Sequence, residues 1–95
     1  MVIFMEYDSD IYYDVINLYN KNITEIPKKW SPQCKELDLS YNQITKIPKD
    51  WRPRCKIIDL SSNQITKIPK EWKPQCEILY FDDNIIRSKN LKMIL

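Results

Sequence analysis

A ten-residue segment of this chain recurs almost unchanged 21 positions later. Residues 39–48 read LSYNQITKIP, and residues 60–69 read LSSNQITKIP. A fixed period in the twenties is typical of a solenoid, in which each repeat packs mainly against its neighbours, so function is expected on a surface. Other residues recur at the same offset, namely Trp30, Trp51 and Trp72, Pro32, Pro53 and Pro74, and Cys34, Cys55 and Cys76.

Aligned at this period, the chain divides into four repeats between two end segments. The central repeats, 34–54 and 55–75, follow the pattern C-x-x-[LI]-x-[LF]-x-x-N-x-I-T-x-I-P-x-x-W-x-P-x nearly throughout. The repeats at 13–33 and 76–88 fit it only in part, as is expected of repeats that close the ends of an open core. The predicted organisation is a capping hairpin within 1–12, repeats over 13–88, and a tail or cap over 89–95.

The repeats carry a known signature, L-x-x-L-x-L-x-x-N-x-L. Here it stands as Cys34-x-x-Leu37-x-Leu39-x-x-Asn42-x-Ile44, and it is repeated 21 residues later. In these residues the chain resembles the leucine-rich repeat family, and its short period is similar to that of some bacterial effector and large-DNA-virus members. The resemblance implies an α/β-type solenoid, a right-handed coil with a short parallel sheet.

The residue types favour the same architecture. Apolar and polar residues alternate in Leu37-Asp38-Leu39 and its counterparts, which is the pattern of a half-buried strand. Two prolines follow each strand, as at Pro48 and Pro53, and they exclude a long return helix. We therefore expect a convex side of irregular, PPII or 3₁₀ chain, and parallel strands near 15–18, 36–39, 57–60 and 78–81.

Three ladders of identical residues are predicted to build the scaffold. The asparagines Asn42, Asn63 and Asn84 follow the strands, where their amides can pair with backbone groups at the bend. The cysteines are predicted to be buried, inert thiols, because the chain has no histidine and no C-x-x-C pair to complete a zinc site. The tryptophans are predicted to fill the core, although stacking on nucleic-acid bases is an alternative.

Basic residues also recur on the convex side. The net charge of +2 is too small to indicate nucleic-acid binding by itself. Such a stripe is usually a solvated face, and contact with an acidic partner or a phosphate backbone is the alternative. The stripe comprises Lys28, Lys46, Lys49, Lys67 and Lys70, joined by Arg52, Arg54 and Lys73.

The outward side chains of the strands form the candidate binding surface. On the concave face, Ile57, Ile78 and Tyr80 are predicted to make an exposed apolar patch beside Tyr41, surrounded by carboxylates. An apolar centre with an acidic rim suits a protein that presents Lys or Arg around a hydrophobic residue. The predicted contact residues are Glu36, Asp38, Tyr41, Ile57, Asp59, Ile78, Tyr80, Asp82 and Asp83.

Catalysis is not expected. Asp38 and Asp59 could share a proton as neighbours, but four short coils offer no closed cleft, and without histidine there is no nucleophile–base pair. We expect no cofactor, no metal site and, since no run of 18 apolar residues occurs, no membrane span.

These observations predict a non-enzymatic module that binds another protein through its concave face. The alternatives are a self-assembling structural subunit, that is a homo-oligomer, or weak nucleic-acid binding by the basic convex side. One cysteine per repeat favours a reducing compartment. The expected location is therefore the cytoplasm, and the host cytoplasm if the protein is viral or an effector.

Overall fold

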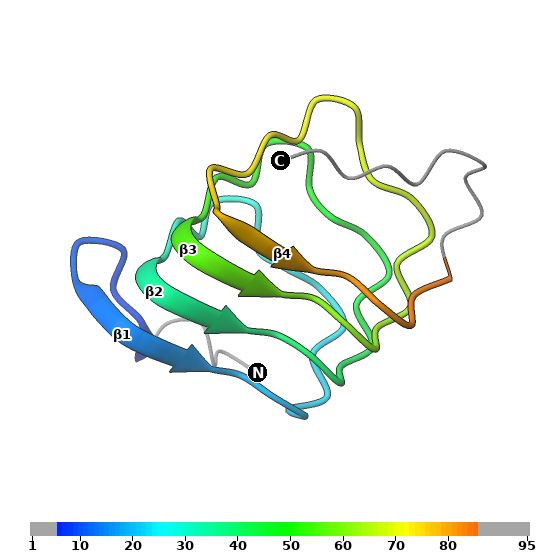
Figure 1. Cartoon of the computed structure of the whole chain (residues 1–95), viewed down its shortest axis with the longest axis horizontal. Coiled ribbons are helices and arrows are strands. Elements are labelled where there is room, and N and C mark those ends of the chain that lie inside the picture. Colours follow the sequence, from blue (N-terminus) through cyan, green and yellow to red (C-terminus); the bar gives the residue numbers. More distant parts are fainter. Residues whose placement is uncertain (1–5, 86–95) are drawn as a thin grey trace.

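The computed structural model describes residues 6–85, which form one parallel sheet backed by long loops (Figure 1). Neighbouring strands are hydrogen-bonded in chain order, so each loop returns the chain to the start of the next strand. The predicted solenoid with a short parallel sheet is therefore confirmed. Its strands are β1 (Tyr12–Asn17), β2 (Gln33–Asp38), β3 (Arg54–Asp59) and β4 (Ile78–Tyr80).

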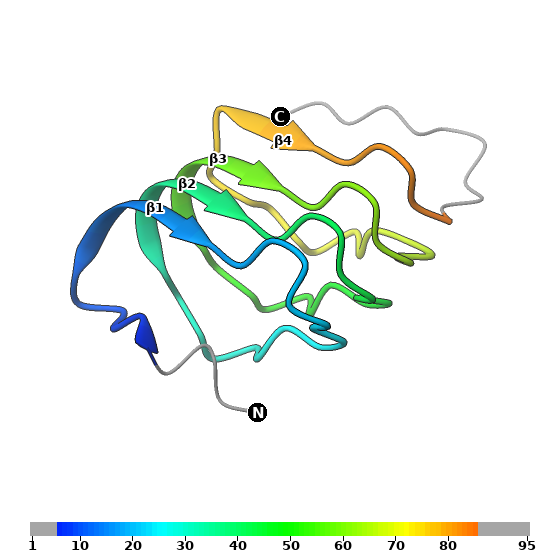
Figure 2. The ribbon, with the colours of Figure 1, turned by 90° about the horizontal axis from the view of Figure 1, so that it is seen from below.

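The 21-residue offset of the sequence becomes the register of the sheet. Cys34 is paired with Cys55, and Asp38 with Asp59, across the β2–β3 ladder. Asp59 in turn is paired with Tyr80 of β4. Equivalent positions of successive repeats thus lie side by side, and the coils stack in parallel when the molecule is seen from below (Figure 2).

The first three strands begin three residues earlier than the alternation of residues predicts. The Arg54 amide already donates to the Pro32 carbonyl at 2.8 Å, before the predicted start at residue 57. Strict alternation fails at this point because Cys55 and Ile58, three positions apart, are both buried. The bend that this spacing requires leaves two successive residues outside the core, and a period of two does not detect such a strand.

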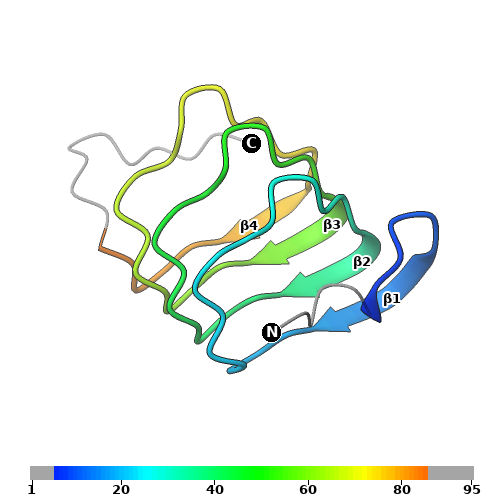
Figure 3. The same ribbon diagram turned by 180° about the vertical axis from the view of Figure 1, so that it is seen from behind.

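The outer segments contain no α-helix within residues 6–85, and they run alongside one another behind the sheet (Figure 3). Each coil contains one tight turn closed by a tryptophan amide. The Trp30 amide donates to the Pro27 carbonyl at 3.0 Å, and the same bond recurs one and two repeats later at 3.1 Å. The 3₁₀ chain expected on the convex side is thus limited to one hydrogen-bonded turn in each of these loops.

The tryptophans stack inside the coil, as predicted. Trp51 is completely buried between its two counterparts, with ring centroids 6.4 Å from Trp30 and 5.9 Å from Trp72 and planes inclined by 14° and 2°. Aliphatic ladders from the strands and loops fill the space between these rings and the sheet. A thin coil without helices needs such bulky side chains, and they are not available as a stacking platform for bases.

The asparagines close the bend after each strand, as predicted. The Asn42 amide nitrogen donates to the carbonyls of Leu18, Leu39 and Ser40 at 2.9–3.1 Å. Its Oδ1 accepts from the Lys21 and Ile23 amides at 3.0 and 2.9 Å. One buried side chain therefore joins two coils through five backbone groups, and Asn63 and Asn84 repeat most of this pattern in the next coils.

Residues 7–9 pack on the first coil. The rings of Tyr7 and Tyr13 meet edge to face with centroids 5.2 Å apart, and Gln33 Nε2 donates to the Ser9 carbonyl at 2.7 Å. The predicted hairpin depends on residues 1–5 and the predicted tail on residues 89–95. Both segments lie outside the described residues, so these two assignments stay predictions.

Candidate functional site

The outward side chains of the strands form the surface that the sequence predicted as the concave face, and we call it the sheet face. The pairing Val15–Glu36–Ile57–Ile78 runs across all the strands, and the next outward row runs Asn17–Asp38–Asp59–Tyr80. The residues that the sequence predicted to be neighbours are therefore neighbours on one sheet. These rows make up the sheet face between the bends that precede and follow the strands.

The apolar part of the sheet face is concentrated on β4. Ile78 is 41% exposed and Tyr80 47% exposed, as predicted, whereas Ile57 is only half-buried on β3 and contributes less open surface than expected. Val15, at the opposite end of the same row, is exposed as well. The row is interrupted by the half-buried Glu36, so its two apolar ends are separate.

Two of the predicted acidic residues have a structural role. Asp38 Oδ1 accepts the Ser40 amide at 2.9 Å and the Ser40 hydroxyl at 2.5 Å. Asp59 binds Ser61 in the same way, at 3.0 and 2.5 Å. These carboxylates stabilise the turn after the strand. Each can accept hydrogen bonds from a partner only through the lone pairs that the serine does not use.

The last described coil breaks this pattern. Tyr80 stands in place of the aspartate, and Asp82 in place of the serine. Asp82 and Asp83 are both exposed. Asp82 and Asp83 therefore offer accessible carboxylates at this corner, next to the exposed ring of Tyr80.

A pair of tyrosines follows the carboxyl ends of β1 and β2. The rings of Tyr19 and Tyr41 lie 5.3 Å apart at 59°, and both side chains are exposed. Tyr41 has a φ of 57°, a left-handed conformation that is uncommon for an aromatic residue and costs on the order of 1 kcal/mol. Tyr41 is one of the predicted contact residues, whereas Tyr19 is not among them, because the 21-residue offset places Ser40 rather than Tyr41 opposite it.

A further outward row was missed entirely. Asp14, Lys35, Lys56 and Glu77 are all exposed, because the bend between the buried positions 34 and 37 turns two successive residues outward. The predicted concave face carries these lysines as well as carboxylates, so it is not uniformly acidic, in contrast to the prediction of an acidic concave side. On β2 and β3, Lys35, Arg54 and Lys56 lie toward the amino ends and Asp38 and Asp59 at the carboxyl ends, whereas Asp14 and Glu77 add negative charge to the same outward row as the lysines.

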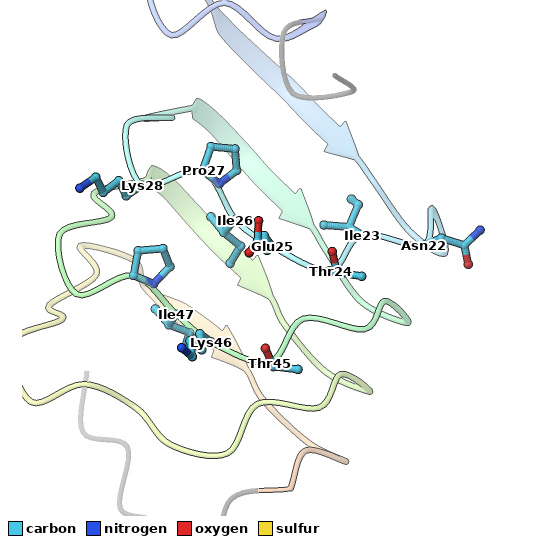
Figure 4. Close-up of a pocket in the computed structure, with 11 residues that line it drawn as sticks. Asn22, Ile23, Thr24, Glu25, Ile26, Pro27, Lys28, Thr45, Lys46 and Ile47 are labelled. Atoms are coloured by element: carbon cyan, nitrogen blue, oxygen red, sulfur yellow. The ribbon is translucent and has the colours of Figure 1, made fainter. Parts of the chain in front are cut away.

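The outer loops of the first two coils enclose a hollow of about 870 Å³ (Figure 4). The isoleucines in its lining are buried core residues, whereas its lysines, threonines and single glutamate are exposed. Its lining is Asn22, Ile23, Thr24, Glu25, Ile26, Pro27, Lys28, Thr45, Lys46, Ile47 and Pro48.

The thiols are free and mostly buried. A hydrogen bond with the Cys55 thiol, together with burial, raises the pKa of the Cys34 thiol. Burial also raises the pKa of the Cys76 thiol. Because the thiolate is the reactive form, Cys34 and Cys76 are less nucleophilic than ordinary thiols, in agreement with a role in packing.

Comparison with protein-family models gives one family. The model described as Leucine Rich Repeat matches residues 33–53 and 54–74, two consecutive segments that start one residue before the repeats predicted from the period. Searches of curated proteins and of solved structures gave no significant match. Within residues 6–85, no helix has the length and apolar character needed to cross a membrane.

Proposed function

Because this chain is a leucine-rich repeat coil, and repeats of this family generally mediate contacts between proteins, we propose that it binds another protein through its sheet face. The surface is open and made of side chains from separate coils. Affinity would come from the apolar and aromatic residues on β4, and partner choice from the charges around them.

One observation carries this proposal most directly. Ile78 and Tyr80 stand exposed on β4 beside the accessible carboxylates Asp82 and Asp83. Tyrosine is enriched at the centres of protein interfaces, because its ring buries a large area while its hydroxyl keeps a polar contact. A partner with an apolar side chain flanked by Lys or Arg would satisfy both parts of this corner.

The site is better suited to binding than to catalysis. Asp38 and Asp59 each use one oxygen to hold a serine, and both lie on an open face rather than in a cleft. A carboxylate pair acts as an acid–base dyad when water is excluded around it. We therefore propose a non-enzymatic role.

The sheet-face proposal is tested by affinity capture from a cytosolic lysate with mass spectrometry. The affinity of the double variant Tyr80→Ala, Ile78→Asp for the specific partner should be lower by about tenfold or more, because loss of one interface anchor costs about 2 kcal/mol or more. The matched control is Lys67→Ala, an exposed outer-loop change. A partner retained by the double variant, with circular dichroism showing an intact fold, would contradict the proposal.

A second candidate partner is another copy of this chain. β2 and β3 carry Lys35, Arg54 and Lys56 toward their amino ends and Asp38 and Asp59 at their carboxyl ends, so two copies facing each other with these strands antiparallel would pair opposite charges. Light scattering should then give a dimer mass at micromolar concentration, and the mass should fall to that of a monomer at high salt. A monomer at every concentration and salt level excludes this candidate.

A further inference from the structure

A small pocket lies where three successive outer loops turn back toward the sheet. Its volume is about 250 Å³, and it shares no lining residue with the hollow of the first two coils. The residues come from equivalent positions of adjacent coils, so the 21-residue offset brings them together. Its lining is Ser31, Arg52, Pro53, Arg54, Lys73 and Gln75.

Every polar side chain in this lining can donate a hydrogen bond. Two guanidinium groups and one ammonium supply three positive charges, and the serine hydroxyl and glutamine amide add neutral donors. The lining contains no carboxylate. Within residues 6–85, Arg52, Arg54 and Lys73 also form no ion pair, so their charge is not neutralised there.

Both arginines donate hydrogen bonds to backbone carbonyls. Arg52 Nη1 donates to the Lys49 and Trp51 carbonyls at 2.8 and 3.3 Å. Arg54 Nη2 donates to the Ser9 carbonyl at 3.5 Å. These bonds use only some of the five N–H donors of each guanidinium, and the remaining donors can serve a ligand.

We propose that this pocket binds a single phosphate group carried by a phosphorylated side chain of the partner protein. A phosphate ester carries a charge of about −1.5 to −2, and arginine recognises its oxygens through paired hydrogen bonds. Arg54 is the first residue of β3, so the pocket adjoins the amino end of the sheet face. This inference rests on the proposed function, because a partner on the sheet face would bring the phosphate within reach.

The flanking coils favour a single phosphate over a nucleic-acid backbone. The position of Arg54 is occupied by Gln33 in the preceding coil and by Gln75 in the following one, and Ser31 replaces Arg52 in the preceding coil. The pair of arginines is therefore confined to one coil. A nucleic-acid backbone presents phosphates at regular spacing and is usually bound along a continuous basic track.

The test measures binding to the full chain by calorimetry and by amide chemical shifts. The probes are a short peptide with a central phosphoserine, the same peptide without phosphate, inorganic phosphate, and a single-stranded oligonucleotide. We expect the phosphopeptide to bind at least about tenfold more tightly than its unphosphorylated form, because hydrogen bonds to charged groups are among the stronger ones. The largest shifts should occur at Arg54 and Gln75.

The decisive variant is Arg52→Ser with Arg54→Gln, because the preceding coil carries these residues at the same positions and folds with them. It should lose about tenfold or more of phosphopeptide affinity. The control Lys67→Gln, Lys70→Gln removes the same charge from exposed positions outside the pocket and should change the affinity by less than about twofold.

Several outcomes would overturn the inference. The first is an equal loss of phosphopeptide affinity in both variants, and the second is equal affinity for the phosphorylated and unphosphorylated peptides. The others are binding of inorganic phosphate without binding of the phosphopeptide, and tighter binding of the oligonucleotide than of the phosphopeptide. The variant Tyr80→Ala, Ile78→Asp leaves the pocket intact and should keep phosphopeptide affinity. Failure of the pocket and failure of the sheet-face proposal are thereby distinguishable.

Discussion

Replacing Trp51 with alanine is expected to lower the free energy of unfolding by about 3–5 kcal/mol, the usual cost of deleting a large buried aromatic side chain. The ring is completely buried, and it separates Trp30 from Trp72 in the stack. Removing it deprives both neighbours of a packing surface. A domain of this size is expected to have a total stability of about 5–15 kcal/mol, so this one substitution should remove a large fraction of it.

The loss should come from packing rather than from a hydrogen bond. The indole N–H of Trp51 is buried and has no hydrogen-bond partner in the described part of the chain, so its removal leaves no acceptor unpaired. Urea unfolding followed by circular dichroism gives the measurement. The control is Asp50→Ala, an exposed neighbour that should change stability by less than about 0.5 kcal/mol. A loss below about 1 kcal/mol for Trp51→Ala would show that the stack is not a stabilising core.

Changing Asn42 to aspartate should destabilise the protein by about 3 kcal/mol or more, although the two side chains have the same shape. The amide nitrogen of Asn42 donates to three carbonyls, from Leu18, Leu39 and Ser40. A carboxylate oxygen cannot donate, so these carbonyls lose a partner, at about 1–3 kcal/mol for each buried group left unsatisfied. The substitution also buries a negative charge next to carbonyl oxygens.

The same substitution at Asn84 provides the matched control. Asn84 donates to equivalent carbonyls but is only partly buried, so water can replace its bonds. Thermal unfolding of both variants should show a clearly larger decrease in Tm for Asn42→Asp. Little or no decrease in Tm for Asn42→Asp would mean that the asparagines contribute through their shape alone and not through their donors.

The period of the sequence was sufficient to predict the sheet, its register and the three scaffold ladders. Register followed because equivalent positions of a stacked repeat must face one another. The tryptophan and asparagine ladders followed because their residue types have few other uses in a coil without helices. These inferences concern positions that every coil repeats, such as Trp51 and Asn42.

What the sequence did not predict depends on local departures from the repeat. The outward row containing Lys35 and Lys56 arises from a bend between two buried positions, which a period of two cannot represent. The contact of Tyr19 with Tyr41 crosses columns, because these residues lie 22 positions apart rather than 21. The 21-residue offset placed Arg52 beside Lys73 in one basic stripe, but it did not indicate that the loops form a pocket there that also includes Ser31 and Gln75.

The pairing of each residue with its counterpart in the next repeat has a consequence for how such a chain can change in length. A duplication of one whole unit would add a rung while leaving every existing contact in place, since each rung touches only those on either side. A duplication of any other length would shift all later side chains off their partners. Growth of this protein is therefore restricted to whole multiples of its repeat, and each added rung would lengthen the surface open to a partner.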